Sequence, residues 1–282
     1  MIALLYAAVV LCSISQSTLN KCNKGGDAVR FNFFKGLSAF VVFFGIFLFS
    51  AEGFHAPTLL FGAAHGVLLA IANQCGYRAL HSGPMALTSL LVNFSLIIPF
   101  FFGVLYLGER PSLFAYIGFV LLGAALVFLN LRPGKGGKRP SLRWGIFVLL
   151  TMLANGFCSV TTSWHQRLYP EQYELGFTAW TVLVCFAIFA VLALAGGKLK
   201  HKYHKPRCDL YAGTAGLVNT MASFLIVLLA AKSPATILYP LLSATTMLAA
   251  LFVGRLLFRE RLNRNQLIGF AIGICSVVLL NL

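Results

Sequence analysis

Apolar residues occur in ten runs along the chain, separated by short polar or basic stretches. The runs cover residues 2–19, 31–50, 57–77, 84–106, 113–131, 144–164, 175–196, 210–230, 235–257 and 265–282. A helix needs about 20 predominantly apolar residues to cross the hydrocarbon core of a bilayer. The pattern therefore predicts an all-α integral membrane protein with about ten transmembrane helices and short loops.

The composition agrees with this pattern. Of the 282 residues, 59% are hydrophobic and 10% are charged, whereas a soluble domain has about 45–50% apolar and about 25% charged residues. One core in water could not bury so large an apolar surface, so the surface needs lipid. The 7 cysteines are scattered without metal-binding or disulfide spacing, and we interpret them as small packing residues.

The second half of the chain repeats the first at an offset of 150 or 151 positions, and such an offset indicates a duplicated unit. The matched pairs are Gly66 and Gly216, Ala72 and Ala222, Pro84 and Pro234, Glu109 and Glu260, Gly118 and Gly269, and Asn130 and Asn281. We expect one five-helix repeat over 1–131, a basic linker over 132–143 and a second five-helix repeat over 144–282. Because five is odd, the second repeat enters the membrane from the opposite side, so the repeats are inverted.

Basic residues gather in every second loop. The chain has 22 Lys and Arg against 7 Asp and Glu, a formal charge of +15. Only Arg110, Arg167 and Lys232 belong to even-numbered loops; the others, Lys35 among them, are grouped with odd-numbered loops. Loops rich in Lys and Arg face the cytoplasm. Both termini are therefore predicted outside it, in a multi-pass protein of the plasma (inner) membrane. Topology accounts for the charge, and we expect no nucleic-acid partner.

Two short motifs, each present twice, carry a family resemblance. Residues 83–87, Gly-Pro-Met-Ala-Leu, open the fourth run, and residues 107–110, Leu-Gly-Glu-Arg, follow it. Residues 233–240, Ser-Pro-Ala-Thr-Ile-Leu-Tyr-Pro, and 258–261, Phe-Arg-Glu-Arg, stand in the same places around the ninth run. The pattern resembles the drug/metabolite transporter superfamily, specifically its ten-helix EamA type. The resemblance implies a secondary carrier with a central cavity between its halves and alternating access. Relatives generally have cytoplasmic termini, whereas the charge pattern here predicts the reverse.

Polar side chains inside the apolar runs are the candidate solute-binding groups, because such groups usually face the bundle interior or a wet cavity. The candidates are Asn73, Gln74, Tyr77, Arg78, Asn93, Asn219, Ser223, Tyr239 and Ser243. His65 is the candidate for proton coupling, because imidazole titrates near neutral pH. For each residue, a hydrogen bond that holds two helices together is the alternative interpretation. Arg78 could instead extend to the membrane surface.

No carboxylate lies in the middle of an apolar run. The seven in the chain are Asp27, Glu52, Glu109, Glu171, Glu174, Asp209 and Glu260. Glu109 and Glu260 are interpreted as structural partners of a basic neighbour or a helix N-terminus. A proton-coupled exporter of organic cations would place an acid within the membrane. We therefore expect a small polar metabolite that is neutral, zwitterionic or anionic, either amino-acid-like or sugar-like.

Three other functions are alternatives to a secondary carrier. An enzyme is disfavoured, because the sequence contains no HExxH, Gly-x-Ser-x-Gly, P-loop or intramembrane aspartate pair. We accordingly expect no catalytic residue, metal or cofactor. A flippase for lipids or lipid-linked carriers shares the predicted architecture, and a membrane scaffold would need no solute site. The expected partners are a small-molecule solute and membrane lipid, and the sequence leaves a homodimer open.

Overall fold

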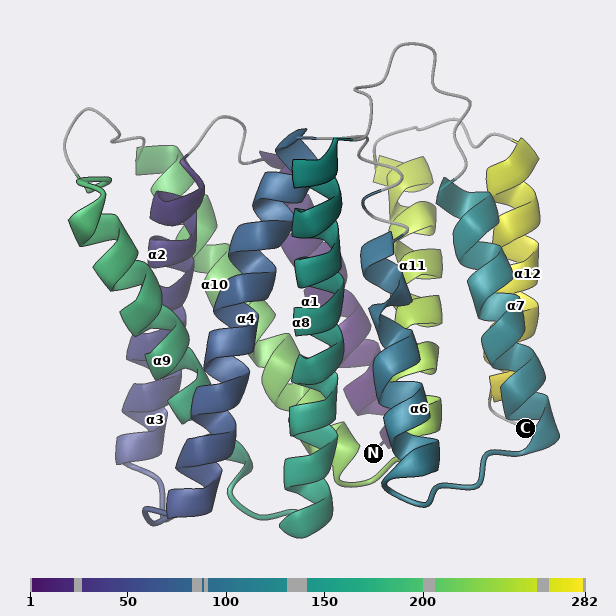
Figure 1. Cartoon of the computed structure of the whole chain (residues 1–282), viewed down its shortest axis with the longest axis horizontal. Coiled ribbons are helices and arrows are strands. Elements are labelled where there is room, and N and C mark those ends of the chain that lie inside the picture. The colour runs from purple at the N-terminus through teal and green to yellow at the C-terminus, as the bar shows by residue number, and fades with distance from the viewer. Residues whose placement is uncertain are drawn as a thin grey trace. The chain divides into compact units, whose positions relative to one another are not determined.

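Every element is helical in the part of the chain that the computed structural model describes, which comprises residues 2–22, 27–82, 88, 91–130, 141–199, 206–257 and 264–280 (Figure 1). The all-α prediction is thereby confirmed. Five of these helices are long and apolar enough to cross a membrane: 28–48, 56–79, 142–168, 174–195 and 207–230. Shorter apolar helices cover 2–12, 91–105, 113–128 and 267–280. The number of ten spans and the inversion of the repeats stay predictions.

The helices group into two compact units, which we call unit 1 and unit 2. Unit 1 comprises residues 1–74 and 161–232, and unit 2 comprises residues 75–160 and 233–282. Each unit therefore takes helices from both halves of the sequence. The predicted repeats divide the chain by sequence similarity, whereas the compact units divide it by how the helices pack.

Unit 1 is built around the second apolar run. Its helices are α1 (Ile2–Cys22), α2 (Ala28–Ala39), the π-helical turn η1 (Phe40–Phe44), α3 (Gly45–Leu48), α9 (Glu174–Ala195) and α10 (Pro206–Ala230), with the start of α4 (Ala56–Ser82) and the end of α8 (Leu142–Leu168). Helix α2 packs against both α9 and α10, and α1 packs against α10. Gly36 allows the first of these contacts, because a Cβ there would lie 3.3 Å from the backbone of Phe186. Small residues let membrane helices approach in this way.

Unit 2 contains the remaining parts of α4 and α8. Its other elements are the 3₁₀ turn η2 (Phe94–Leu96), α6 (Ile97–Leu105), α7 (Leu113–Asn130), α11 (Ala235–Leu257) and α12 (Arg264–Leu280). Helix α7 packs along α12, and α6 packs along α11. Gly118 permits close packing of α7 and α12, and its carbonyl accepts a hydrogen bond of 2.7 Å from the Ser276 hydroxyl. Leu96, Leu122 and Leu126 form a buried cluster beside them.

The helix predicted over 31–50 starts three residues before the apolar run. Helix α2 begins at Ala28, because the Asp27 side chain accepts hydrogen bonds from the backbone N–H groups of Val29 and Arg30 and thereby caps the helix. Arg30 and Lys35 therefore lie inside this helix. Grouping them with a loop was an error.

The predicted helix over 84–106 is less regular than expected. Within its described part, the 3₁₀ turn Phe94–Leu96 precedes the helix Ile97–Leu105. Pro99 lies just after this turn. Proline has no N–H to donate and its ring crowds the carbonyl four residues earlier, so a regular α-helix cannot continue through it unchanged.

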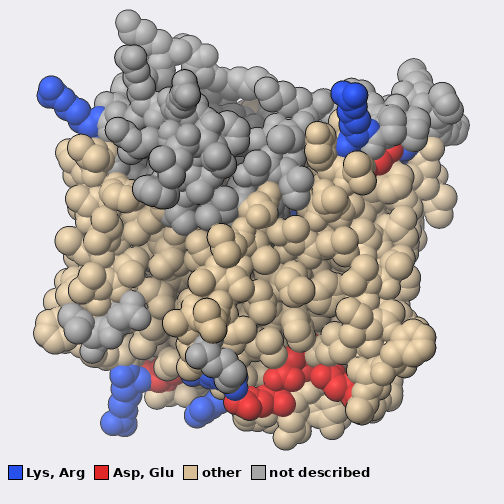
Figure 2. Space-filling model, turned by 180° about the vertical axis from the view of Figure 1, so that it is seen from behind, with Lys and Arg blue, Asp and Glu red and all other residues tan. Residues whose placement is uncertain are grey.

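The helices carry exposed apolar side chains outward. Leu60 is 68% exposed, Val120 is 69% exposed and Leu105 is 72% exposed. Figure 2 shows one face of the molecule, on which the Lys, Arg, Asp and Glu side chains drawn in colour lie toward the upper and lower margins, and the described surface between them is mostly tan, that is, uncharged. Large exposed apolar areas are rare on soluble monomers, so these faces suit lipid.

Candidate functional site

A small polar cavity lies within unit 1, among α2, α4, α9 and α10. Its lining residues are Asn32, Lys35, Gly36, Ala39, Leu69, Asn73, Val182, Cys185, Phe189, Asn219 and Thr220. The polar members come from three helices that are otherwise strongly apolar. The cavity measures about 20 Å³, which is room for about one water molecule. In this conformation the polar groups therefore converge on a closed space.

Lys35 brings a charge into this cavity. Its Nζ donates a hydrogen bond of 3.2 Å to Oδ1 of Asn73. The residue lies seven positions after the start of α2 at Ala28, which is about 10 Å along the helix axis. Among the described residues it forms no ion pair. An ammonium group with only an amide acceptor is thus held at membrane depth.

Amides and hydroxyls surround Lys35. Asn32 donates a hydrogen bond of 3.4 Å from Nδ2 to Oε1 of Gln74, so α2 and α4 are joined by two polar side-chain contacts. Asn219 and the buried Thr220 face the same cavity from α10. Amides both donate and accept hydrogen bonds. The group can therefore bind hydroxyl, amino or carboxylate groups of a solute.

The backbone of α2 is held tightly at Lys35. A Cβ on Gly216 of α10 would overlap the Lys35 carbonyl oxygen. The Ser38 hydroxyl is 2.8 Å from the carbonyl of Gly213 and 3.1 Å from the carbonyl of Lys35. These contacts set the distance between α2 and α10 and thus the position of Lys35 in the cavity.

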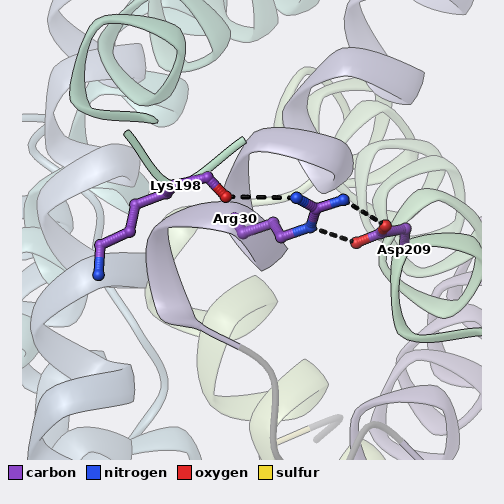
Figure 3. A network of polar contacts seen from close by, with 3 residues as sticks. All are labelled: Arg30, Lys198 and Asp209. Carbon is purple, nitrogen blue, oxygen red and sulfur yellow. Dashed lines mark hydrogen bonds and ion pairs between the residues drawn. The ribbon is translucent and has the colours of Figure 1, made fainter. Parts of the chain in front are cut away.

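A second basic residue of α2 is bound differently. Arg30, which is 6% exposed, donates to both carboxylate oxygens of Asp209, at 2.9 and 2.7 Å, and to the carbonyl of Lys198 at 3.2 Å (Figure 3). The Lys198 ammonium reaches Asp27 at 3.0 Å. Partial burial would raise the pKa of Asp27. The hydrogen bonds from Lys198 and from the backbone of Arg30 outweigh this effect, so the pKa lies below its ordinary value. This network ties α2, the turn after α9 and α10 together at one end of unit 1.

The structure brings some of the predicted site residues of unit 1 together. Asn73 and Asn219 line the cavity, and Gln74 adjoins it through Asn32. The Ser223 hydroxyl donates to the Asn219 carbonyl of its own helix at 3.0 Å. Nδ1 of His65 is 2.9 Å from the Thr161 hydroxyl and is not among the cavity residues.

The other predicted site residues belong to unit 2. Tyr239 donates its hydroxyl to the carbonyl of Ser159 at 2.9 Å. Arg78 is exposed, and its guanidinium lies 5.7 Å from the centre of the Phe147 ring. Asn93 is exposed as well, and Tyr77 and Ser243 are half-buried. Lys35 and Asn32 were not among the predicted site residues. The available signal was a polar residue and a charged one inside the second apolar run.

Unit 2 has a larger cleft of about 360 Å³, lined by Glu109, Arg110, Pro111, Ser112, Pro234, Thr236, Ile237 and Leu280. The cleft is lined mainly by the loop between α6 and α7 and by the start of α11. Its carboxylate already has a structural role: Glu109 accepts hydrogen bonds of 2.8 Å from the backbone N–H groups of both Ala235 and Thr236. The predicted pairing of Glu109 with a helix N-terminus is therefore observed. Glu260 lies outside the described residues.

Further polar contacts join α4 to α8. Thr58 is 2.8 Å from Nδ1 of His55 and 3.0 Å from Nε2 of His165, which is fully buried. Nδ1 of His165 is 3.3 Å from Nε2 of Gln166. Within the described part of the chain, no group of three or more His, Cys, Asp or Glu side chains could hold a metal ion.

Comparison with known families assigns this helical chain. Residues 143–282 match the model of the EamA-like transporter family. Through these residues the chain belongs to the EamA-like transporter family. Another protein, whose crystal structure has been solved, matches this EamA-like chain with a TM-score of 0.79 and 15% identity, covering 100% of this chain and 98% of that one. This likeness concerns the fold alone. No curated protein matches the chain.

The family assignment confirms the resemblance seen in the motifs. An EamA-like protein is a membrane transporter of small solutes, and the apolar helices described above are those of a multi-pass membrane protein. The polar cavity of unit 1 is accordingly the candidate solute-binding site.

Proposed function

We propose that this EamA-like chain is a secondary carrier that moves a small polar metabolite by alternating access. The observation that carries the proposal is the cavity of unit 1, where Asn73, Asn219 and Thr220 converge with Lys35 inside apolar spans. Polar groups at membrane depth cost free energy and usually serve a pathway or a site. Their convergence from three helices on one space favours solute binding over isolated helix-to-helix hydrogen bonds.

The size of the cavity supports a cycle with more than one conformation. A site for a small molecule has a volume of roughly 300 Å³ or more, and the cavity has about 20 Å³. Binding a metabolite therefore requires helices around Lys35 to move apart. Alternating access requires two such opened states, in which the cavity faces opposite sides of the membrane.

The solute class follows from the lining groups. The polar lining consists of amides, a hydroxyl and an ammonium, and no described carboxylate is among the lining residues. This favours a neutral, zwitterionic or anionic solute, amino-acid-like or sugar-like, over an organic cation.

Two features support the inverted repeats, while the placement of the termini outside the cytoplasm rests on the loop charges. The packed helix pairs α2 with α9, α6 with α11 and α7 with α12 each join one helix from 1–131 to one from 144–282. The matched residues Gly66 and Gly216 both face a backbone carbonyl, since a Cβ on Gly66 would lie 2.7 Å from the carbonyl of Thr181. An impermeant thiol reagent tests the topology: cysteines replacing Gly53 and Arg143, in a chain without native cysteines, should react from opposite sides.

Counterflow in proteoliposomes tests the function. Vesicles preloaded with unlabelled serine, glutamine, glutamate or glucose should accumulate the labelled form of the transported solute. Asn73→Ala should reduce this flux strongly. Ser15→Ala should not, because Ser15 is exposed on α1 and bonds only within its own helix. A chain that moves a labelled phospholipid and none of these solutes would be a flippase and would contradict the carrier proposal.

A further inference from the structure

The two basic residues of α2 described here differ in whether a carboxylate balances their charge. Arg30 is matched by the two oxygens of Asp209. Lys35, five positions later, has one hydrogen-bond partner for its ammonium among the described residues, the amide oxygen of Asn73. An ammonium carries three N–H donors, so two of them have no partner among the described residues. A charge removed from water without a counter-charge destabilises the fold, which calls for a reason outside folding.

The carboxylates of unit 1 are engaged elsewhere. Asp27 binds Lys198 and Asp209 binds Arg30, while Glu171 binds Lys232. Glu52 accepts hydrogen bonds from the backbone N–H groups of Leu175 and Gly176, the latter at 2.7 Å. Glu174 lies in the first turn of α9. None of them lines the cavity of Lys35.

None of the described residues in the cavity wall is a strong acid. Besides Lys35, the one titratable side chain among the described lining residues is the thiol of Cys185, which is a far weaker acid than a carboxyl group. The amides of Asn73 and Asn219 and the hydroxyl of Thr220 complete the polar lining. The site therefore has one fixed positive charge beside groups that can donate further hydrogen bonds. This combination suits an anionic oxygen group, because a charge-assisted hydrogen bond is stronger than a neutral one.

We infer that Lys35 binds the anionic group of the transported solute, so that the substrate is an organic acid or a phosphorylated metabolite. The inference rests on the proposed carrier function and narrows its solute class. No described residue neutralises the charge of Lys35, so its ammonium serves as the counter-charge of the bound anion. Asn73 orients this ammonium toward the cavity.

Matched pairs of acids and their neutral analogues test this inference. The purified chain in lipid nanodiscs is heated in the presence of lactate or lactamide, gluconate or glucose, and glycerol 3-phosphate or glycerol. We expect an acid to raise the melting temperature and its neutral partner to have no effect. The first two pairs probe a carboxylate and the third probes a phosphate. Labelled forms of the same compounds are then tested for counterflow in proteoliposomes.

Variants at Lys35 separate charge from shape. Lys35→Met should weaken binding of the acid by about tenfold to a hundredfold, the value of a hydrogen bond to a charged group. It should also melt at a higher temperature than the unaltered chain without ligand, because a buried charge has been removed. Lys35→Arg should retain acid binding, because arginine stays charged in any protein site. The control Lys232→Met removes an equal charge from a residue that does not line the cavity and that forms an ion pair with the exposed Glu171, and it should change neither binding nor flux.

The outcomes are distinct. Equal stabilisation by acid and neutral analogue, or undiminished acid binding by Lys35→Met, would overturn the role of Lys35 while leaving the carrier intact. Transport of the neutral compounds and of none of the acids would also overturn the role of Lys35 and leave the carrier function intact. Failure of the unaltered chain to move any compound of the panel would overturn both the inference and the proposed function.

Discussion

The guanidinium of Arg30 and the carboxylate of Asp209 face each other through two parallel hydrogen bonds, Nε to Oδ1 at 2.9 Å and Nη2 to Oδ2 at 2.7 Å. The two residues are 179 positions apart in sequence. Their side chains are 7% and 14% exposed. Such two-point pairing fixes both distance and orientation. It therefore holds α2 and α10 in the alignment that the cavity needs.

Breaking this pair should cost much more than removing both partners. Asp209→Asn leaves the Arg30 charge buried, and we expect a loss of about 3 kcal/mol in the free energy of unfolding. Arg30→Met combined with Asp209→Leu should recover most of that loss. Equilibrium unfolding in mild detergent measures both variants. Equal losses in the single and double variants would show that the pair is not coupled.

Acid should remove the contribution of Asp27. Because its pKa is lower in the folded chain than in the unfolded chain, its ionised form stabilises the fold above the unfolded value of about 3.9. That stabilisation disappears as the pH falls through the lower, folded pKa. Asn also caps helices well, so Asp27→Asn isolates the charge. The variant should be less stable than the original chain at pH 7, and the difference should shrink as the pH falls through the folded pKa of Asp27.

Glu109 should stabilise the start of α11. Its two oxygens accept from Ala235 and Thr236, so Glu109→Ala leaves two backbone donors without their partner and should cost about 1–2 kcal/mol. Gly103→Ala should have a similar effect, because a Cβ there would lie 2.6 Å from Oε2 of Glu109. The control is Glu171→Ala, another loop glutamate whose side chain is 61% exposed. Its loss should stay below about 1 kcal/mol.

Two glycines of α10 should respond differently to the same change. Gly216→Ala places a methyl group on the Lys35 carbonyl, so α2 and α10 must separate. Gly213→Ala meets only the Ser38 Cβ, at an ordinary distance of 3.8 Å. We expect a marked fall in melting temperature and in transport for the first variant and nearly unchanged values for the second. Similar behaviour of the two variants would contradict the close contact at Gly216.

Thr58 should matter through its hydroxyl rather than its volume. Thr58→Val keeps the shape but leaves Nε2 of the buried His165 without its 3.0 Å partner. An unsatisfied buried polar group costs about 1–3 kcal/mol, and thermal unfolding should show that loss. Thr214→Val is the control, because Thr214 is exposed and bonds within its own helix.

The helices and several cavity residues could be predicted from the sequence, because both depend on the local pattern of apolar and polar residues. A run of about 20 apolar residues specifies a spanning helix without knowledge of its neighbours. Asn73 and Asn219 were visible as polar residues within such runs. The family motifs added the carrier function, which the pattern of polarity alone does not contain.

Lys35 and the Arg30 network were not predicted, for different reasons. The charge count grouped Lys35 with a loop, although the residue lies inside the predicted run 31–50. Partners such as Arg30 and Asp209 lie far apart in the chain, and their pairing depends on how α2 packs on α10. One sequence without its packing cannot supply that information.

The position of Lys35 has an electrical consequence. In a carrier that works as proposed, the empty site has a net positive charge, and the site loaded with a monovalent anion is neutral. A charge that crosses the full field gains or loses about 2.3 kcal/mol per 100 mV. The transmembrane voltage would thus act on the return of the unloaded protein and leave the loaded step almost unaffected.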